Sequence, residues 1–155
     1  MYVRNIARGF HCSNIPALLF KLDIAKAFDT VRWDYLLDLM CRQGFPQKCC
    51  DWLLSVWASS SSRVIVNGVP GPPIQHGRGF RQGDPLSPML FALAIDPLVN
   101  MLKKATKNGR LSKLHGRHAH LCVSLYADDA AIFVAPTETD VRTLKDILCC
   151  FGLAT

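Results

Sequence analysis

The stretch that decides the fold is residues 121–135, "LCVSLYADDAAIFVA". Two short apolar runs, 121–126 and 130–135, lie on either side of Asp128 and Asp129. Short apolar runs that are interrupted by turn residues are typical of a β-hairpin. The stretch therefore predicts two antiparallel strands whose turn carries two neighbouring acids.

The two acids of this turn are also the first indication of function. Asp is common in turns, so a purely structural role for Asp128 and Asp129 is one interpretation. Adjacent carboxylates inside an apolar hairpin repel each other, however, and this costs stability unless a cation neutralises them. Hard carboxylate oxygens suit Mg²⁺, which keeps part of its octahedral shell for water and substrate phosphates. A Mg²⁺ site is the second interpretation.

A further acid follows another predicted strand. In "ALLFKLD", residues 17–23, Leu18, Phe20 and Leu22 alternate with a second set that ends at Asp23, which is the period of a strand. Asp23 by itself is better explained as a turn or cap residue. If the two strands are neighbours, the three acids converge, as a two-metal phosphoryl-transfer site requires, with metals about 3.5–4 Å apart. Spacing alone does not establish that the strands are neighbours.

The remaining patterns predict helices around one sheet. Helical spacing and terminal signals indicate helices over 33–43, 47–59 and 85–105, and a last helix from the capping-box residue Thr137 to about Phe151. Asn67-Gly68 indicates a hairpin turn. The order predicts an α+β fold, an antiparallel sheet backed by helices on one face, with the other, polar face open. Four apolar residues of the second helix are expected in the core: Trp52, Leu53, Val56 and Trp57.

Composition limits the class of protein. A chain of 155 residues, half of them hydrophobic, fits one domain. The most apolar stretch carries Asp96 and three prolines, and no signal peptide is evident, so no membrane span and an intracellular location, nucleus or cytoplasm, are expected. Seven cysteines without a C-x-x-C pair indicate reduced thiols. The "HGRHAH" run at 115–120 lacks the partners of a metal site.

The charge distribution favours a polyanionic partner. The net charge is +6, and no acid lies between Asp96 and Asp128 or between Asp51 and Asp84. A solvated basic face explains such a distribution as well as phosphate contact does. The cations of these two acid-free stretches are Arg63, Arg78, Arg81, Lys103, Lys104, Lys107, Arg110, Lys113 and Arg117.

Three motifs together resemble one known family. "FKLDIAKAFDTV" resembles the first palm motif of reverse transcriptases, "GRGFRQGDPLSP" the second, and "LYADDAAIF" the third, in the family's order. The amino-acid sequence is most similar to that of plant LINE-type, non-LTR retrotransposons, and the resemblance covers nearly the whole chain after about Pro16. The resemblance implies a polymerase palm with motifs near 18–31, 77–88 and 121–135.

The resemblance also implies roles for particular residues. Asp23, Asp128 and Asp129 would be the metal-binding triad for two Mg²⁺ ions, with Mn²⁺ as a substitute, and Asp23 and Asp128 are the stronger candidates. Residues that would lie along the nucleotide and template pocket are Ile24, Phe28, Arg81, Gln82 and Gly83. Phe28 would exclude a 2′-OH, although a plain core phenylalanine is the alternative. Asp84 and Pro85 would turn the chain into its helix.

The implied activity is that of an RNA-directed DNA polymerase, whose partners are an RNA template, a DNA primer and a deoxynucleoside triphosphate. Fingers, thumb and endonuclease regions of complete family members are not recognised here, so the chain resembles a fragment of a degraded element or a partial gene model. Those segments, or another element-encoded protein, would then be partners. Two alternatives stay open: a catalytically silent nucleic-acid-binding remnant, and a metal-dependent nuclease that uses the same acids.

Overall fold

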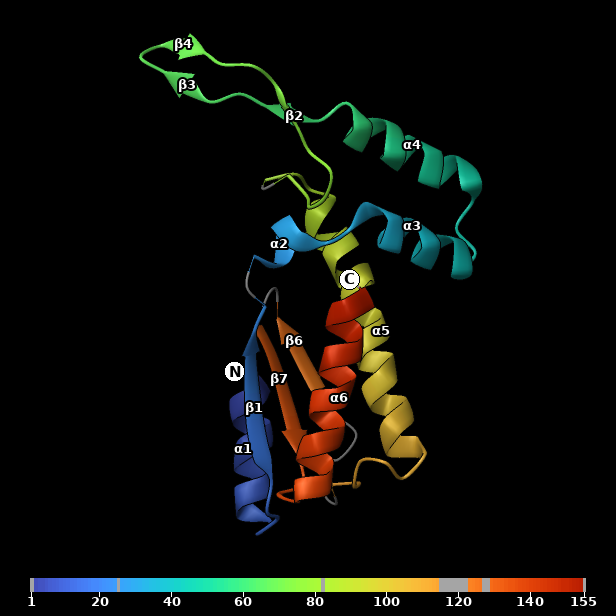
Figure 1. Ribbon diagram of the computed structural model, residues 1–155. Coiled ribbons are helices and arrows are strands. Elements are labelled where there is room, and N and C mark those ends of the chain that lie inside the picture. Colours follow the sequence, from blue (N-terminus) through green and yellow to red (C-terminus); the bar gives the residue numbers. More distant parts are fainter. Residues whose placement is uncertain (1, 25, 82, 115–122, 127–128, 155) are drawn as a thin grey trace. The chain divides into compact units, whose positions relative to one another are not determined.

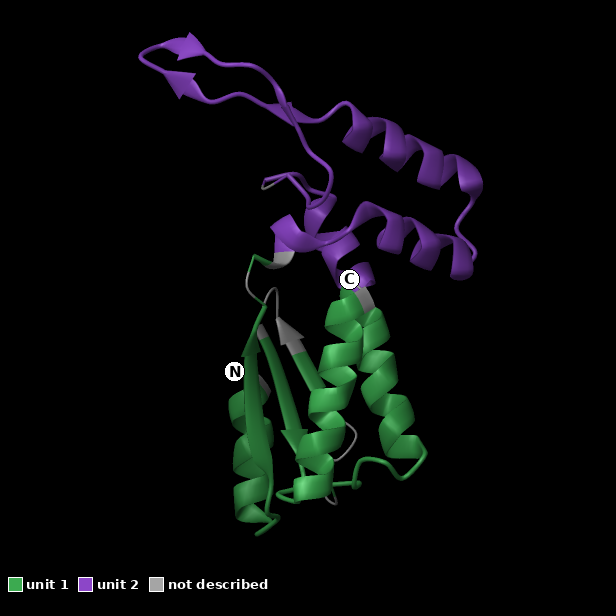
Figure 2. Cartoon of the chain, viewed as in Figure 1, with its two compact units in different colours: residues 1–27, 95–154 green, residues 28–94, 155 purple. Residues whose placement is uncertain are grey.

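The computed structural model describes residues 2–24, 26–81, 83–114, 123–126 and 129–154 (Figure 1). The chain divides into two compact units, coloured separately in Figure 2: residues 1–27 with 95–154, and residues 28–94. Among the described residues, none of the helices has both the length and the apolar character needed to cross a membrane. The assignment of the whole chain to a single domain stays a prediction.

The first unit is built on a three-stranded antiparallel sheet. Its strands are β1 (Leu18–Asp23), β6 (Val123–Tyr126) and β7 (Asp129–Val134), in the order β1-β7-β6. Both strands of the hairpin predicted from the sequence are present and paired with each other. Strand β1 pairs with the opposite edge of β7, so the two predicted strands that carry the acids are neighbours.

Helix α1 (Tyr2–Cys12) covers one face of this sheet. Ile6 and Phe10 form a buried cluster with Leu114 and Phe133, and the rings of Phe10 and Phe133 lie 5.4 Å apart between centroids. The prediction of helices on one face only is therefore wrong. The missed signal is the apolar spacing of Val3, Ile6, Ala7 and Phe10, which marks one side of an amphipathic helix.

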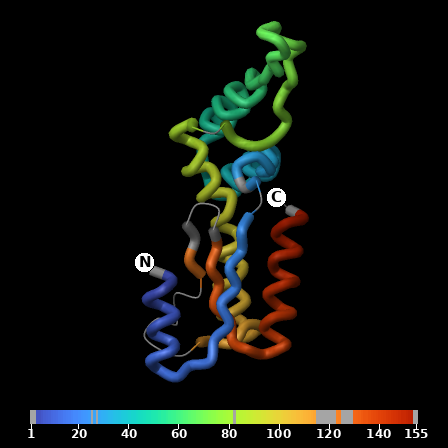
Figure 3. Tube along the Cα trace, turned by 90° about the vertical axis from the view of Figure 1, so that its left-hand side faces the viewer, coloured from blue at the N-terminus to red at the C-terminus, as the bar shows by residue number. Residues whose placement is uncertain are grey.

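Helix α6 (Glu138–Ala154) lies on the opposite side of the sheet from α1, as Figure 3 shows. The C-terminal part of α5 (Ser87–Lys107) belongs to the same unit. Residues 130–134 of β7 are all buried, so over these five residues neither side of the central strand is exposed to water. A strand covered on both faces carries a continuous apolar run instead of an alternating one. The sequence "AAIFV" fits that position.

The second unit contains a pair of antiparallel helices. Helices α3 (Trp33–Arg42) and α4 (Gln47–Ala58) end within one residue of the predicted bounds. Gly44, at φ +82°, makes the turn between them, where the Phe45 N–H donates to Met40 O at 3.0 Å. Trp57 is buried and stacks on Trp33, with centroids 5.5 Å apart.

One expectation for this helix pair is wrong. Trp52 and Val56 of α4 are not core residues, because 62% and 59% of their surfaces are exposed. They lie on the turns next to the buried Cys50 and Trp57, but on the outer side of the helix. Apolar residues on both sides of α4 made the buried side impossible to choose from spacing alone.

Two short ribbons follow α4. Strands β2 (Ser61–Ser62) and β5 (Ile74–Gln75) pair, and β3 (Ile65–Val66) pairs with β4 (Val69–Pro70). The turn between β3 and β4 is the predicted Asn67-Gly68, and both residues have positive φ, +50° and +81°. Two consecutive residues with positive φ are the signature of a type I′ hairpin turn.

Helix α5 begins after a capping turn. The Asp84 carboxylate accepts the Leu86 N–H at 2.9 Å, which confirms that Asp84 turns the chain into its helix. Phe91, four residues after the start of α5 at Ser87, is buried in the second unit. Gly109, at φ +72°, terminates α5 as predicted. In α6, the Asp140 N–H donates to Thr137 Oγ1 at 3.2 Å, the bond expected of a capping residue.

Candidate metal and nucleotide site

The site begins with two acids on adjacent strands. Asp23, the last residue of β1, lies directly opposite Asp129, the first residue of β7. The Cα atoms of such cross-strand partners are about 4.5–5.5 Å apart. Tyr126 of β6 is the other partner of Asp129. Asp128 lies outside the described residues. The structure thus brings two of the three predicted positions together through backbone pairing that sequence spacing could not establish.

Asp23 is exposed at the end of β1. Leu22 and Phe20 are half-buried, whereas Lys21 and Asp23 are exposed, as the alternation in the sequence predicts. Asp23 points to the face that α1 covers farther along, where Phe133 pairs with Leu19. In Figure 1, α1 lies beside the far half of β1. A carboxylate at an open strand end is accessible to a cation and to a substrate.

The chemistry of the donors fits a hard cation. Carboxylate oxygens at neighbouring positions are what Mg²⁺ prefers, and no thiolate or imidazole belongs to the predicted set. Like charges directly opposite each other on a sheet are destabilising without a counter-ion. Among the described residues no group of three or more histidines, cysteines and acids could hold a metal ion. Asp128, the side chain of Asp129 and the histidines of 115–120 lie outside what the structure describes, so this finding does not cover them.

In the second unit, the start of the second motif is bonded to the end of the first. The Gly79 N–H donates to Val31 O at 2.8 Å. In return, Trp33 Nε1 donates to Gly79 O at 2.7 Å. Arg78 also forms an isolated antiparallel bridge with Arg32. These contacts hold the two motif segments side by side.

Gly79 is a residue whose importance the sequence interpretation missed. Its φ is +79°, and an added Cβ would lie 2.6 Å from the backbone oxygen of Asp29. Only glycine allows this approach of two backbones. The signal in the sequence was "GRG" at 77–79, where the second glycine, and not the first, has the strained conformation.

Phe28, the predicted sugar-contacting residue, packs inside the second unit. It lies on helix α2 (Ala27–Thr30), is half-buried, and its ring contacts that of Phe91 with centroids 4.9 Å apart. The carbonyl of Phe28 accepts the Phe80 N–H. Ile24, just beyond β1, is half-buried. The packing of Phe28 agrees with the core alternative, and its predicted role toward the sugar stays untested.

Arg81 and Gly83, two of the predicted pocket residues of the second motif, lie next to the start of α5, where the Asp84 N–H donates to Arg81 O at 3.3 Å. Arg81 is exposed, and its carbonyl accepts the buried Ser87 hydroxyl at 2.7 Å. Gly83 has φ +87° and open space around it, so a glycine is required there by conformation and not by crowding. Gln82 lies outside the described residues. The turn thus presents the Arg81 side chain to solvent while its backbone is fixed to the start of α5.

The basic residues near the end of α5 are exposed and lie at the end of the first unit away from Asp23 (Figure 1). Two of them, Lys104 and Lys107, are in the last turn of the helix, where cations are stabilised by the helix dipole. Both interpretations of these charges, phosphate contact and a solvated face, therefore stay open. The exposed cations are Lys103, Lys104, Lys107, Arg110 and Lys113.

Together, fold and site define an α+β domain with opposed carboxylate positions at one end of a small antiparallel sheet. A family model described as reverse transcriptase (RNA-dependent DNA polymerase) matches residues 11–152. The chain belongs to the reverse transcriptase family.

Individual relatives agree with this assignment. The chain is 31% identical over 144 residues, 93% of its length, to a transposon TX1 uncharacterized 149 kDa protein of Xenopus laevis. It is 38% identical over 85 residues, 55% of its length, to a retrovirus-related Pol polyprotein from the type-1 retrotransposable element R2 of Nasonia vitripennis. It spans 11% and 8% of these two proteins. The R2 relatives confirm the predicted retrotransposon class.

The predicted similarity to plant elements has one relative in its support. An uncharacterized mitochondrial protein of Arabidopsis thaliana is 42% identical over 72 residues, which are 43% of this chain and 57% of that protein. This support is weak, because that stretch is less than half of the chain.

Proposed function

We propose that this chain forms the palm of an RNA-directed DNA polymerase. In the reaction, a primer 3′-hydroxyl attacks the α-phosphate of a deoxynucleoside triphosphate on an RNA template, a new phosphodiester forms, and pyrophosphate leaves. The single observation that carries the proposal is the pairing of Asp23 with Asp129. Membership in the family supplies the reaction class, and the pairing supports the proposed convergence of the acids.

Asp23, Asp128 and Asp129 are proposed as the ligands of two Mg²⁺ ions, which Mn²⁺ could replace. When bound, such ions lower the pKa of the attacking hydroxyl and neutralise charge on the transferred phosphate and leaving group. The contribution of the chain itself is to hold the carboxylates together before substrate arrives. Backbone pairing between β1 and β7 places the Cα atoms of Asp23 and Asp129 opposite each other, and fixed positions of this kind reduce the reorganisation that binding requires.

The nucleotide and template pocket is proposed to include Ile24, Phe28, Arg81, Gln82 and Gly83. The exposed Arg81 guanidinium suits a phosphate, because its donors match phosphate oxygens in pairs. The absence of a side chain at Gly83 leaves its surroundings free for a base or a backbone. Phe28 is held by Phe91, and a ring held in one place is what discrimination against a 2′-hydroxyl requires.

Two other functions are tested against this one. A silent remnant would keep the exposed cations of α5 and bind RNA without extending a primer. A metal-dependent nuclease would use the same acids to cleave strands in the absence of nucleotides. The proposed reaction requires an RNA template and a DNA primer as partners. Because the chain spans about a tenth of its TX1 relative, further polymerase segments are proposed partners as well.

The deciding experiment is primer extension on an RNA template with Mg²⁺ and deoxynucleotides. The parent is compared with Asp128→Asn, Asp23→Asn and the control Asp146→Asn, whose acid is exposed on α6 and lies outside the three motifs. Extension by the parent and by Asp146→Asn alone supports the proposal. Cleavage without nucleotides supports the nuclease. No extension by folded parent protein, together with RNA binding that weakens steeply as salt rises, supports the silent remnant.

A further inference from the structure

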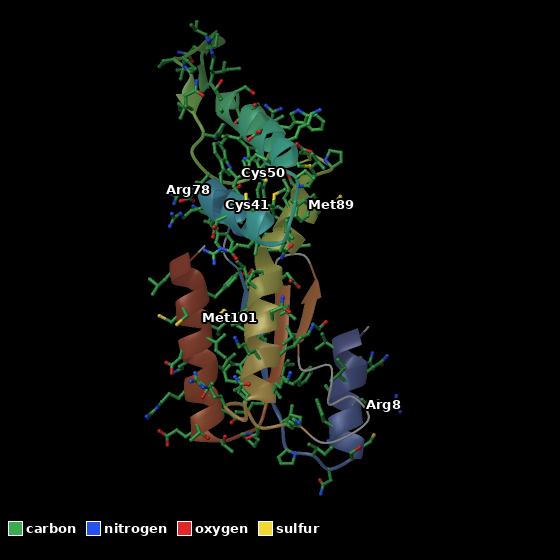
Figure 4. All side chains as sticks on the ribbon, turned by 90° about the vertical axis from the view of Figure 1, so that its right-hand side faces the viewer. Arg8, Cys41, Cys50, Arg78, Met89 and Met101 are labelled. Atoms are coloured by element: carbon green, nitrogen blue, oxygen red, sulfur yellow. The ribbon has the colours of Figure 1, made fainter. Side chains whose placement is uncertain are left out.

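Cys41 and Cys50 face each other across the α3–α4 helix pair. Cys41 is in the last turn of α3 and Cys50 in the first half of α4. Their Sγ atoms are 4.0 Å apart, and Figure 4 labels both residues. We propose that this pair is an oxidative modification site, at which a peroxide converts the two thiols into a disulfide that links α3 to α4. The proposal is independent of polymerase activity.

The geometry favours a bond between these two thiols. A disulfide requires the sulfurs to approach to about 2.05 Å, so they must move about 2 Å closer. Both helices are held by buried side chains, Leu36 and Met40 on α3 and Trp57 on α4. The turn at Gly44 is closed by the bond from Phe45 N–H to Met40 O. The pair is thus held in place before oxidation.

The two thiols differ in accessibility, and this gives them different roles. Cys41 is exposed, whereas Cys50 has only 3% of its surface exposed. Burial, and secondarily the neighbouring Cys41 thiol, raise the pKa of Cys50. A thiol with a raised pKa is a poor first nucleophile. Cys41 therefore meets the oxidant, and Cys50 completes the disulfide.

The reaction balances with hydrogen peroxide as the oxidant. The Cys41 thiolate attacks one peroxide oxygen, the O–O bond breaks, and a sulfenic acid forms with release of hydroxide, which takes up the thiol proton to become water. The Cys50 sulfur then attacks the Cys41 sulfur. The S–S bond forms, the S–O bond breaks, and the hydroxyl leaves with the Cys50 proton as a second water. Two thiols are oxidised, and one peroxide is reduced to two waters.

The chain contains its own matched control at Cys49. This residue is half-buried and adjacent to Cys50, yet the contact to Cys41 is made by Cys50. Neighbouring positions on a helix point in directions about 100° apart. A disulfide that depends on this geometry must therefore distinguish position 50 from position 49.

Tryptic mapping detects the linked peptides, and serine variants at positions 49 and 50 then make that distinction. The full chain is treated with a small excess of hydrogen peroxide, free thiols are alkylated, and the protein is digested under non-reducing conditions. Cleavage after Arg32, Arg42, Lys48 and Arg63 places Cys41 in peptide 33–42 and both Cys49 and Cys50 in peptide 49–63. The expected product is these two peptides joined, with a mass two hydrogens below their sum, separated again by a dithiol reductant.

Variants decide which thiols form the bond. Cys49→Ser should keep the linked peptides, while Cys41→Ser and Cys50→Ser should lose them. Cys41→Ser alters an exposed position, so its result stands even if the buried substitution impairs folding, which circular dichroism would reveal. A linked product that survives in Cys50→Ser, that disappears in Cys49→Ser, or that joins peptide 33–42 to residues 149–150 would overturn the proposal. Oxidation of Cys41 to a sulfinic acid with no linked product would overturn it as well.

Discussion

A Cβ atom at position 79 would lie 2.6 Å from the backbone oxygen of Asp29 and 2.8 Å from its Cα. These two residues belong to the first and second sequence motifs, which are 50 positions apart in the chain. Atoms of the backbone cannot move aside as a flexible side chain can. The contact between Gly79 and Asp29 therefore sets how closely the two motif segments of the second unit approach each other.

Gly79→Ala is expected to destabilise the chain by at least about 2 kcal/mol, because the methyl group meets backbone and φ is +79°. Urea unfolding followed by tryptophan fluorescence measures this, since Trp33 and Trp57 lie in the affected unit. Gly77→Ala is the control, because nothing lies within 4 Å of its added Cβ. Equal losses for the two variants would show that the close approach is unimportant.

Asp140→Ala is expected to destabilise the first unit by about 1–3 kcal/mol. The carboxylate of Asp140 is 2% exposed and accepts both the N–H and the hydroxyl of Ser112, at 3.0 and 3.1 Å. It also places negative charge in the first turn of α6. Thermal unfolding of Ser112→Ala gives the comparison, because that change removes only the hydroxyl bond. A larger loss for Ser112→Ala than for Asp140→Ala would contradict this account.

Tyr35 contributes to the stability of the second unit, and this contribution is lost at alkaline pH. Its hydroxyl donates to Ala94 O at 2.9 Å, and burial raises its pKa above the ordinary value of 10.0. The folded chain therefore favours the neutral phenol. This contribution is complete below about pH 10 and is lost as pH rises toward and through the folded-state pKa.

Tyr35→Phe should accordingly cost about 1 kcal/mol at neutral pH. Above the ordinary tyrosine pKa, the parent should lose stability faster than the variant, so that the two curves converge. Chemical unfolding at several values from neutral to alkaline pH measures both slopes. Parallel curves over that range would mean that the Tyr35 hydroxyl does not contribute in this way.

The predictable part of the fold came from local signals. The bounds of α3 and α4, the Asn67-Gly68 turn and the Asp84 cap depend on residues within a few positions of one another, and their chemistry is visible in the sequence. The pairing of β1 with β7 depends on residues more than 100 positions apart, so the sequence could predict it only as a condition, and the structure shows it.

Errors arose where burial depends on a distant partner. Val3, Ile6 and Phe10 had helical spacing, but only the presence of Phe133 on the second face of the sheet decides that this helix covers it. The sequence predicted both Trp52 and Trp57 as core residues, and Trp57 is the one that stacks on Trp33. In the candidate site, the motifs predict the carboxylate positions, whereas the requirement for glycine at 79 arises from a backbone 50 positions away.

The opposed positions of Asp23 and Asp129 lead to a test of metal binding that does not require catalysis. Without metal, Asp23→Asn should raise stability slightly, by about 0.2–1 kcal/mol, because like charges directly opposite on a sheet repel. With Mg²⁺, the parent should gain stability through ligand binding and the variant should gain less. Melting temperatures of both proteins in chelator and at increasing Mg²⁺ measure the two effects. Asp146→Asn, an exposed acid of α6 outside the three motifs, should follow the parent. If Mg²⁺ raises the melting temperatures of parent and Asp23→Asn equally, Asp23 is not a ligand, even though it lies opposite Asp129.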